Sequence, residues 1–98
     1  MTLDPDGIER DLGLERAKYM WPFATYERLR IPYSLGTDAP VVDINSRSVL
    51  YDAVTRRAAE TGYPEGGWHP EECITAAQAV RAYTLGSAIA CGRSRELG

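Results

Sequence analysis

Histidine and cysteine build most zinc centres and many nucleophilic sites, and this chain of 98 residues has few of either. It contains one histidine, His69, and two cysteines, Cys73 and Cys91. A zinc site usually takes three or four ligands from the protein, and a Ser-His-Asp triad would also have to use His69. That histidine lies in the Gly- and Pro-rich stretch 66–70, which indicates a loop. The chain alone is therefore not expected to carry out zinc or triad chemistry.

One carboxylate has a more suggestive setting. Asp38 follows a short apolar stretch and lies in the motif GTDAPV at 36–41. Taken alone, this motif is typical of a turn after a strand. A carboxylate beside a divalent ion could instead accept a proton from bound water and deliver it to a leaving nitrogen. The motif by itself leaves both roles open.

The elements that would position Asp38 are mostly helical. The apolar spacing predicts helices near 7–12, 22–29, 46–61 and 75–91, and Thr75 has the capping-box spacing to Gln78. On the 46–61 helix, Arg56 is predicted to lie on the solvated face. The segment 31–38 predicts the one strand, confined to an edge by its proline. The predicted fold class is mostly α with one or two short strands.

The last predicted helix, 75–91, is apolar around most of its circumference. Such a helix is expected to be buried on several sides, and a chain of this size has little material to cover it. We therefore expect a homo-oligomer formed through this helix, with contacts from Val80, Tyr83, Leu85 and Ile89.

Composition argues against several classes of partner. The chain has 11 Lys+Arg against 14 Asp+Glu, a net charge of -3, so we expect no nucleic-acid binding. No apolar run approaches the roughly 20 residues that cross a bilayer, so we expect no membrane insertion. Residues 1–6 lack the basic and apolar parts of a signal peptide, and two distant cysteines do not form a disulfide scaffold. A cytoplasmic location is therefore expected.

An ordered set of motifs carries a family resemblance. GLER at 13–16, WPF at 21–23, GTDAPV at 36–41, AVTR at 53–56 and AYTLGSA at 82–88 follow one another in the chain. In this order they resemble the amidohydrolase superfamily, in particular its YtcJ-like branch, amidohydrolase family 3. The resemblance extends from about residue 13 to the last residue.

This resemblance implies a place in a larger fold. Members are (β/α)8 TIM barrels of about 250 residues with active sites at the C-terminal ends of the strands. A chain of 98 residues would then be the last βα portion of an incomplete barrel. We expect one fragment-like unit over 1–98: a helical approach at 1–30, the equivalent of strand eight at 31–38, and helices at 46–61 and 75–91. Both ends are expected to fall inside the family pattern.

The resemblance also implies a chemistry. Asp38 would be the catalytic residue and a metal ligand, with zinc the expected divalent metal, but only in a complete parent barrel. The parent would be a metal-dependent hydrolase of C–N bonds in a small-molecule amide-type substrate. The other ligands of the family are missing here, so we expect this chain alone to bind no metal and to be inactive. The alternative is a non-catalytic interaction or regulatory protein derived from an amidohydrolase.

Other polar residues of these motifs have plainer interpretations. Arg16 is expected to pair with Glu15 or Asp11 on a solvated helix. Arg56, in AVTR, is expected to be structural, as a capping or pairing arginine. His69 is interpreted as a surface residue of its loop.

Overall fold

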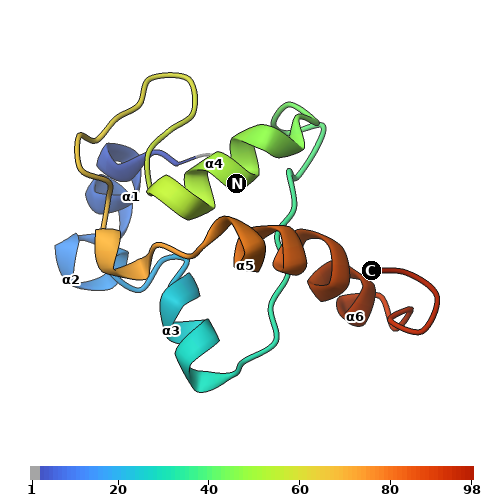
Figure 1. Cartoon of the computed structure of the whole chain (residues 1–98). Helices are drawn as coiled ribbons and strands as arrows, with labels where there is room; N and C mark the ends of the chain where they lie inside the picture. Colours follow the sequence, from blue (N-terminus) through green and yellow to red (C-terminus); the bar gives the residue numbers. More distant parts are fainter. Residues whose placement is uncertain (1–2) are drawn as a thin grey trace.

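The computed structural model describes residues 3–98 and is mostly helical, as predicted. The chain begins with α1 (Pro5–Leu12), α2 (Leu14–Ala17) and α3 (Phe23–Leu29). After a long connection come α4 (Ser46–Thr55), a second loop and the 3-10 turn η1 (Pro70–Glu72). The last helical stretch joins α5 (Ala76–Arg81), the π-helical η2 (Ala82–Gly86) and α6 (Ser87–Ala90) end to end (Figure 1). No helix among the described residues is long and apolar enough to cross a membrane.

The described residues pack into two apolar clusters. The larger lies between α3, α4 and α5 and contains Phe23, Leu35, Val49, Ala53, Ile74, Ala79 and Ala82. The smaller packs the first two helices against the second loop and contains Leu3, Ala17, Ala58 and Trp68. Trp21 packs against both clusters and so connects them.

The predicted strand at 31–38 does not form. No residue of this segment is in a strand, and it runs beside the last helical stretch as irregular backbone (Figure 1). Its attachment there includes the Leu35 N–H, which donates to the Ala82 carbonyl at 3.3 Å, and the Ser87 hydroxyl, which donates to the Leu35 carbonyl at 3.2 Å. A strand needs a partner strand to complete its hydrogen bonds, and the described residues supply none. The prediction of a strand here is therefore wrong; of this segment only Leu35 and Thr37 are buried.

The predicted helix at 46–61 ends early, at Thr55. The next residue, Arg56, adopts left-handed backbone with φ 55°, and its N–H donates to the Asp52 carbonyl at 2.8 Å. This is the αL type of helix ending, usually made by glycine. Because the helix stops there, Arg56 leaves the solvated face on which it was predicted, and its side chain is fully buried. At its other end the helix is capped by Asn45, whose side chain accepts from the Arg47 N–H.

The last helical stretch lies where the sequence predicted it. The Thr75–Gln78 capping box is formed in both directions. The stretch is covered on one side only: Ala79, Ala82 and Ala88 are buried, whereas Val80 and Ile89 are 49% and 44% exposed. At Gly86 a Cβ atom would collide with the Tyr33 carbonyl, so a glycine is needed for the 31–35 segment to lie against this helix.

Candidate functional site

Asp38 lies at the end of the irregular 31–38 segment and is exposed. Its backbone is left-handed with φ 63°, a region that aspartate tolerates better than most side chains. The Asp38 carbonyl accepts from the Val41 N–H at 2.9 Å, and the buried Thr37 hydroxyl accepts from the Ala39 N–H at 3.3 Å. The Asp38 carboxylate makes no hydrogen bond or ion pair with residues 3–98, and the turn leaves it exposed to solvent.

A groove of about 420 Å³ opens beside Asp38. It is lined by Trp21, Phe23, Ser34, Leu35, Gly36, Asp38 and Val42. The lining is mostly apolar, and Asp38 is its one ionisable member. An apolar wall with a single carboxylate could position a small molecule, but it offers one oxygen donor group to a cation.

The described residues do not fit a metal ion. Nowhere in 3–98 do three His, Cys, Asp or Glu side chains come close enough together to hold one. A divalent ion of the zinc type needs three or more protein ligands, and Asp38 is one. His69 lies in a different part of the chain, against Trp68 with its ring centroid 4.7 Å away, and its Nδ1 is 3.1 Å from Glu71 Oε1. Within residues 3–98, Asp38 is therefore not joined by the further ligands that a metal site would need.

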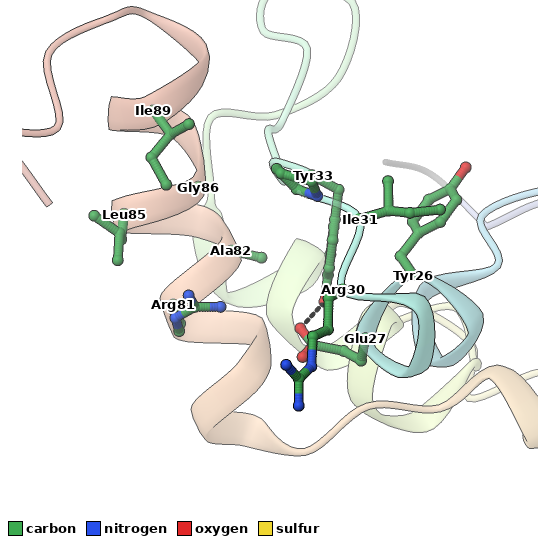
Figure 2. A pocket seen from close by; sticks show the side chains of 11 residues that line it. Tyr26, Glu27, Arg30, Ile31, Tyr33, Arg81, Ala82, Leu85, Gly86 and Ile89 are labelled. Atoms are coloured by element: carbon green, nitrogen blue, oxygen red, sulfur yellow. Dashed lines mark hydrogen bonds between the residues drawn. The ribbon is translucent and has the colours of Figure 1, made fainter.

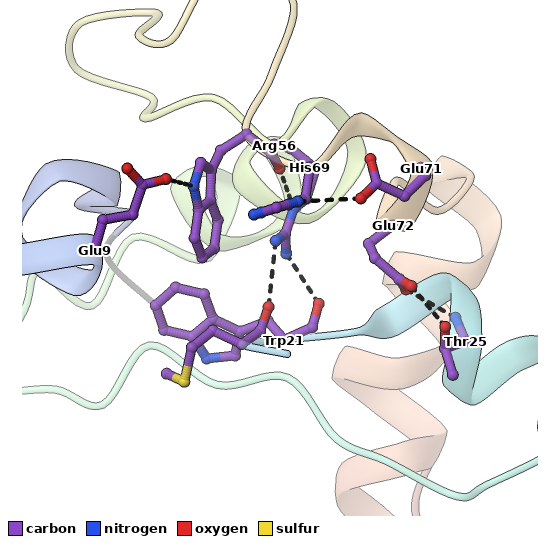
Figure 3. Close-up of polar contacts among 9 residues, drawn as sticks. Glu9, Trp21, Thr25, Arg56, His69, Glu71 and Glu72 are labelled. Atoms are coloured by element: carbon purple, nitrogen blue, oxygen red, sulfur yellow. Dashed lines mark hydrogen bonds and ion pairs between the residues drawn. The ribbon is translucent and has the colours of Figure 1, made fainter. Parts of the chain in front are cut away.

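Arg56 forms the most connected polar group of the described chain. Its guanidinium donates three hydrogen bonds to backbone carbonyls: Nε to Trp68 at 2.9 Å, Nη1 to Trp21 at 2.9 Å and Nη2 to Met20 at 3.3 Å (Figure 3). The side chain is 0% exposed. These bonds tie the end of α4 to the segment after α2 and to the second loop, which are 35 and 12 residues away in sequence.

Two aromatic rings flank the same guanidinium. Its carbon is 5.1 Å from the ring centroid of Trp68 and 5.9 Å from that of Phe23. Those rings belong to the two different apolar clusters. Both distances fall within the range of cation–π attraction. We call Arg56 together with Met20, Trp21, Phe23 and Trp68 the Arg56 cluster; it is the junction of the two cores.

Two acidic residues support the segments that surround the Arg56 cluster. Glu72 of η1 accepts from the Thr25 N–H at 2.8 Å and from the Thr25 hydroxyl at 2.6 Å, and so caps the first turn of α3 (Figure 3). Glu9 of α1 accepts from the Trp68 indole N–H at 2.9 Å. These contacts fix the loop that carries Trp68 on both of its sides.

Asp52 is a third, buried carboxylate. It is 3% exposed, and its Oδ1 accepts from the Ala59 N–H at 3.1 Å. Burial raises the pKa of Asp52 to about 6, while the Ala59 N–H opposes this and the charge of Glu60 adds to it. A carboxyl that titrates near neutrality could move a proton, but Asp52 faces the loop after α4 and does not line the groove beside Asp38.

The structure also places the other polar residues of the motifs. Arg16 is exposed and does not make the predicted ion pairs, because Glu15 binds Lys18 at 2.7 Å and Asp11 binds Arg10 at 3.0 Å. Arg56 is structural, as predicted, but through carbonyls and rings rather than an acidic partner. The sequence holds a possible signal for this role, since a small-residue pattern precedes Arg56 and the chain has two tryptophans. Only the contacts in the structure, however, show that Arg56 binds the segments that carry both tryptophans.

Comparison with known proteins gives one result. The family model described as the amidohydrolase family matches residues 1–98, the whole of the chain. No curated protein matches, and no solved structure matches. With its ordered motifs and Asp38 presented at the end of the 31–38 segment, the chain belongs to the amidohydrolase family. It therefore has a hydrolase-family origin, in a family whose members are generally metal-dependent.

Proposed function

We propose that this chain is the C-terminal barrel segment of a metal-dependent amidohydrolase whose complete form hydrolyses amide-type C–N bonds of a small molecule. The single observation that carries the proposal is the family match over 1–98, within which Asp38 lies in the motif GTDAPV. The 31–38 segment then has the role of strand eight, which needs neighbouring strands that the described residues do not provide.

Within this proposal Asp38 is the one residue of the chain that belongs to the reaction centre. Its support is geometric: an exposed carboxylate, a fixed left-handed turn and an adjacent apolar groove. The zinc or other divalent ion and its remaining ligands would come from outside residues 3–98. The isolated chain is therefore proposed to be inactive, and no reaction step is assigned to it alone.

The test is reconstitution of a barrel from two pieces. An amidohydrolase family enzyme lacking its own last βα portion is mixed with this chain and zinc, and release of amine from that enzyme's amide substrate is measured. We expect hydrolysis by the mixture and none by either piece. Asp38→Asn should abolish it, whereas Asp43→Asn, which changes an exposed carboxylate of the same loop, should not.

The outcomes separate this proposal from its alternative. Hydrolysis by the chain alone, or hydrolysis that survives Asp38→Asn, contradicts the assignment of Asp38. A stable complex without any hydrolysis favours a non-catalytic interaction or regulatory protein derived from an amidohydrolase. Failure to form any complex contradicts the barrel-segment proposal itself.

We further propose that copies of the chain associate in the cytoplasm. The half-exposed Val80 and Ile89 on the last helical stretch support association, since burying each apolar side chain contributes about 1.5–3 kcal/mol. Tyr83 and Leu85, also expected at the contact, are partly covered already. Both cysteines are free thiols, which supports a reducing compartment. Sedimentation of Val80→Ser against the unchanged chain tests the association; equal masses would contradict it.

A further inference from the structure

A second cavity lies at the opposite end of the 31–38 segment from Asp38. It has a volume of about 130 Å³ and is bounded by the end of α3, by residues 31–33 and by the π-helical η2 with its neighbours (Figure 2). It shares no lining residue with the groove beside Asp38. Neither the proposed reaction nor the Arg56 cluster uses it.

The cavity has an apolar part and a cationic part. Ile31, Pro32, Leu85 and Ile89 supply aliphatic surface, and the arginines Arg30 and Arg81 supply two positive charges from opposite walls. Neither guanidinium has a hydrogen bond or an ion pair with any residue of 3–98. Paired arginines beside an apolar surface are suited to an anion, because the guanidinium fork matches a carboxylate.

The one acidic residue of the cavity is already engaged. Glu27 Oε1 accepts from the Tyr33 hydroxyl at 2.8 Å, which holds these two side chains together on the side of the cavity formed by α3 and residues 31–33 (Figure 2). Burial raises the pKa of Tyr33, and the bond to Glu27 raises it further, so the phenol stays a donor to that carboxylate. With two arginines against one glutamate, the cavity keeps a net positive charge.

The walls are held in a fixed shape. Arg30 follows α3 in left-handed backbone at φ 56°. The Arg30 N–H donates to the Glu27 carbonyl at 3.1 Å, and the Ile31 N–H donates to the Tyr26 carbonyl at 2.9 Å. This is a Schellman ending, which sets the direction of the chain after the helix. On the other wall η2 is π-helical, a local distortion found often at functional sites.

We propose that this cavity binds the carboxylate of a small amphipathic acid, with Arg30 and Arg81 on the carboxylate and the alkyl part against Ile31, Leu85 and Ile89. The volume suits a short alkyl or aryl acid rather than a ligand of drug size, whose pockets span roughly 300–1,000 Å³. The site lies away from Asp38 and is independent of the proposed hydrolysis.

The test is a titration of the ¹⁵N-labelled chain with sodium hexanoate, followed by amide chemical shifts. We expect saturable shifts confined to residues 30–33 and 81–89. Arg81→Gln and Arg30→Gln should each weaken binding about tenfold, the loss typical of one charge-assisted contact. Arg47→Gln, which changes an exposed arginine on α4, should leave the affinity unchanged.

Hexanol and hexylamine are the matched probes. Equal binding of hexanol would overturn the role of the arginines, and tighter binding of hexylamine would assign the cavity to a cation at Glu27. Absence of saturable shifts with hexanoate up to 50 mM, a roughly millimolar search range for so small a ligand, would overturn the proposal. Shifts of residues 30–33, which lie outside the proposed contact between copies, with protein concentration alone would show instead that a second copy fills the cavity, and would overturn it too.

Discussion

Arg56 and Asp38 have the same unusual backbone and opposite surroundings. Both are non-glycine residues in left-handed conformation, with φ 55° and 63°, and both lie within the residues that match the amidohydrolase family model. Arg56 is fully buried, bonded to three carbonyls and flanked by two rings. Asp38 is exposed, and no residue of 3–98 contacts its carboxylate by a hydrogen bond.

The contrast separates a side chain that completes its contacts inside this chain from one that makes no hydrogen bond to the described residues. The three carbonyls that accept from the Arg56 side chain all lie within 36 residues of it along this chain, so these hydrogen bonds need no other chain. Asp38 has its position fixed by its own turn but has no chemical partner among the described residues. The left-handed backbone at Arg56 accompanies a buried side chain, whereas the left-handed backbone at Asp38 accompanies an exposed one.

The largest expected effect comes from removing the Arg56 guanidinium. Arg56→Met keeps much of the volume but removes three hydrogen bonds, and it leaves the Met20 and Trp68 carbonyls without a donor from residues 3–98, whereas the Trp21 carbonyl keeps the Phe23 N–H. We therefore expect a loss of about 3–5 kcal/mol in the free energy of unfolding. A small domain has about 5–15 kcal/mol in total, and the variant should be largely unfolded at 37 °C. Urea denaturation followed by circular dichroism measures this.

The neighbouring arginine is the control for that variant. Arg57 Nε donates to the Gly62 carbonyl at 2.6 Å from a partly exposed position. Arg57→Met should cost about 1 kcal/mol, the ordinary value for one hydrogen bond. Equal losses at the two positions would mean that Arg56 does not join the two cores.

The second effect tests how closely the loop packs over the end of α4. Gly67 has φ 89°, and a Cβ atom there would lie 2.6 Å from the Thr55 carbonyl oxygen and 3.3 Å from the Arg56 Cβ. Gly67→Ala should therefore lower the free energy of unfolding by about 2–3 kcal/mol. Gly66, with φ 84° and open space around its Cα, is the matched site, and Gly66→Ala should cost only about 1 kcal/mol. Thermal unfolding of both variants measures the two losses. A larger loss for Gly66→Ala than for Gly67→Ala would contradict the close packing of this loop over α4.

The third effect uses pH. The ordinary pKa of aspartate is 3.8, and burial raises that of Asp52 to about 6, so the folded chain holds this proton to higher pH than the unfolded chain. The free energy of unfolding should therefore fall as pH rises through this interval. Asp52→Asn should be more stable than the unchanged chain at pH 7.5, on the order of 2 kcal/mol, and the difference should shrink toward pH 4.

Denaturation at the two pH values measures this difference directly. Asp43→Asn alters an exposed carboxylate and should stay within about 0.5 kcal/mol of the unchanged chain at both. A stabilisation by Asp52→Asn that does not depend on pH would show that burial of the charge is not its cause.

The smallest effect belongs to Asp38. Because its carboxylate supports no described contact and asparagine tolerates left-handed backbone, Asp38→Asn should change the free energy of unfolding by less than about 0.5 kcal/mol. Calorimetric unfolding checks this. A loss near that of Arg56→Met would remove the distinction between the two residues and give Asp38 a structural role.

Local signals in the sequence were sufficient where the cause is local. The capping box at Thr75 and the end of the first helix at Leu12 form as predicted, because each depends on residues within one turn. The early end of α4 was not predictable in this way, since arginine rarely takes the left-handed position and Arg56 does so only with distant carbonyls around it.

Non-local partners explain the remaining differences. The 31–38 segment has the composition of a strand, yet strand formation depends on a neighbour that no pattern inside the segment can supply. For the candidate site, the family motifs indicated Asp38, and the structure places its side chain in an exposed turn beside the groove. The cavity between Arg30 and Arg81 was missed, because the two arginines lie 51 positions apart and only the packing of Tyr33 against Gly86 brings their walls together.

The two tryptophans of the chain, Trp21 and Trp68, both belong to the Arg56 cluster, where their rings meet edge to face with centroids 6.4 Å apart. Indole emission from this protein is therefore a local signal: it reports the junction of the cores and carries nothing from the α5–α6 stretch, which has no tryptophan. Far-ultraviolet ellipticity, in contrast, averages over every helix. A melt in which ellipticity declines before emission would show that helices away from the Arg56 cluster unfold first, and the lag between the two curves would measure how weakly those helices are coupled to this cluster.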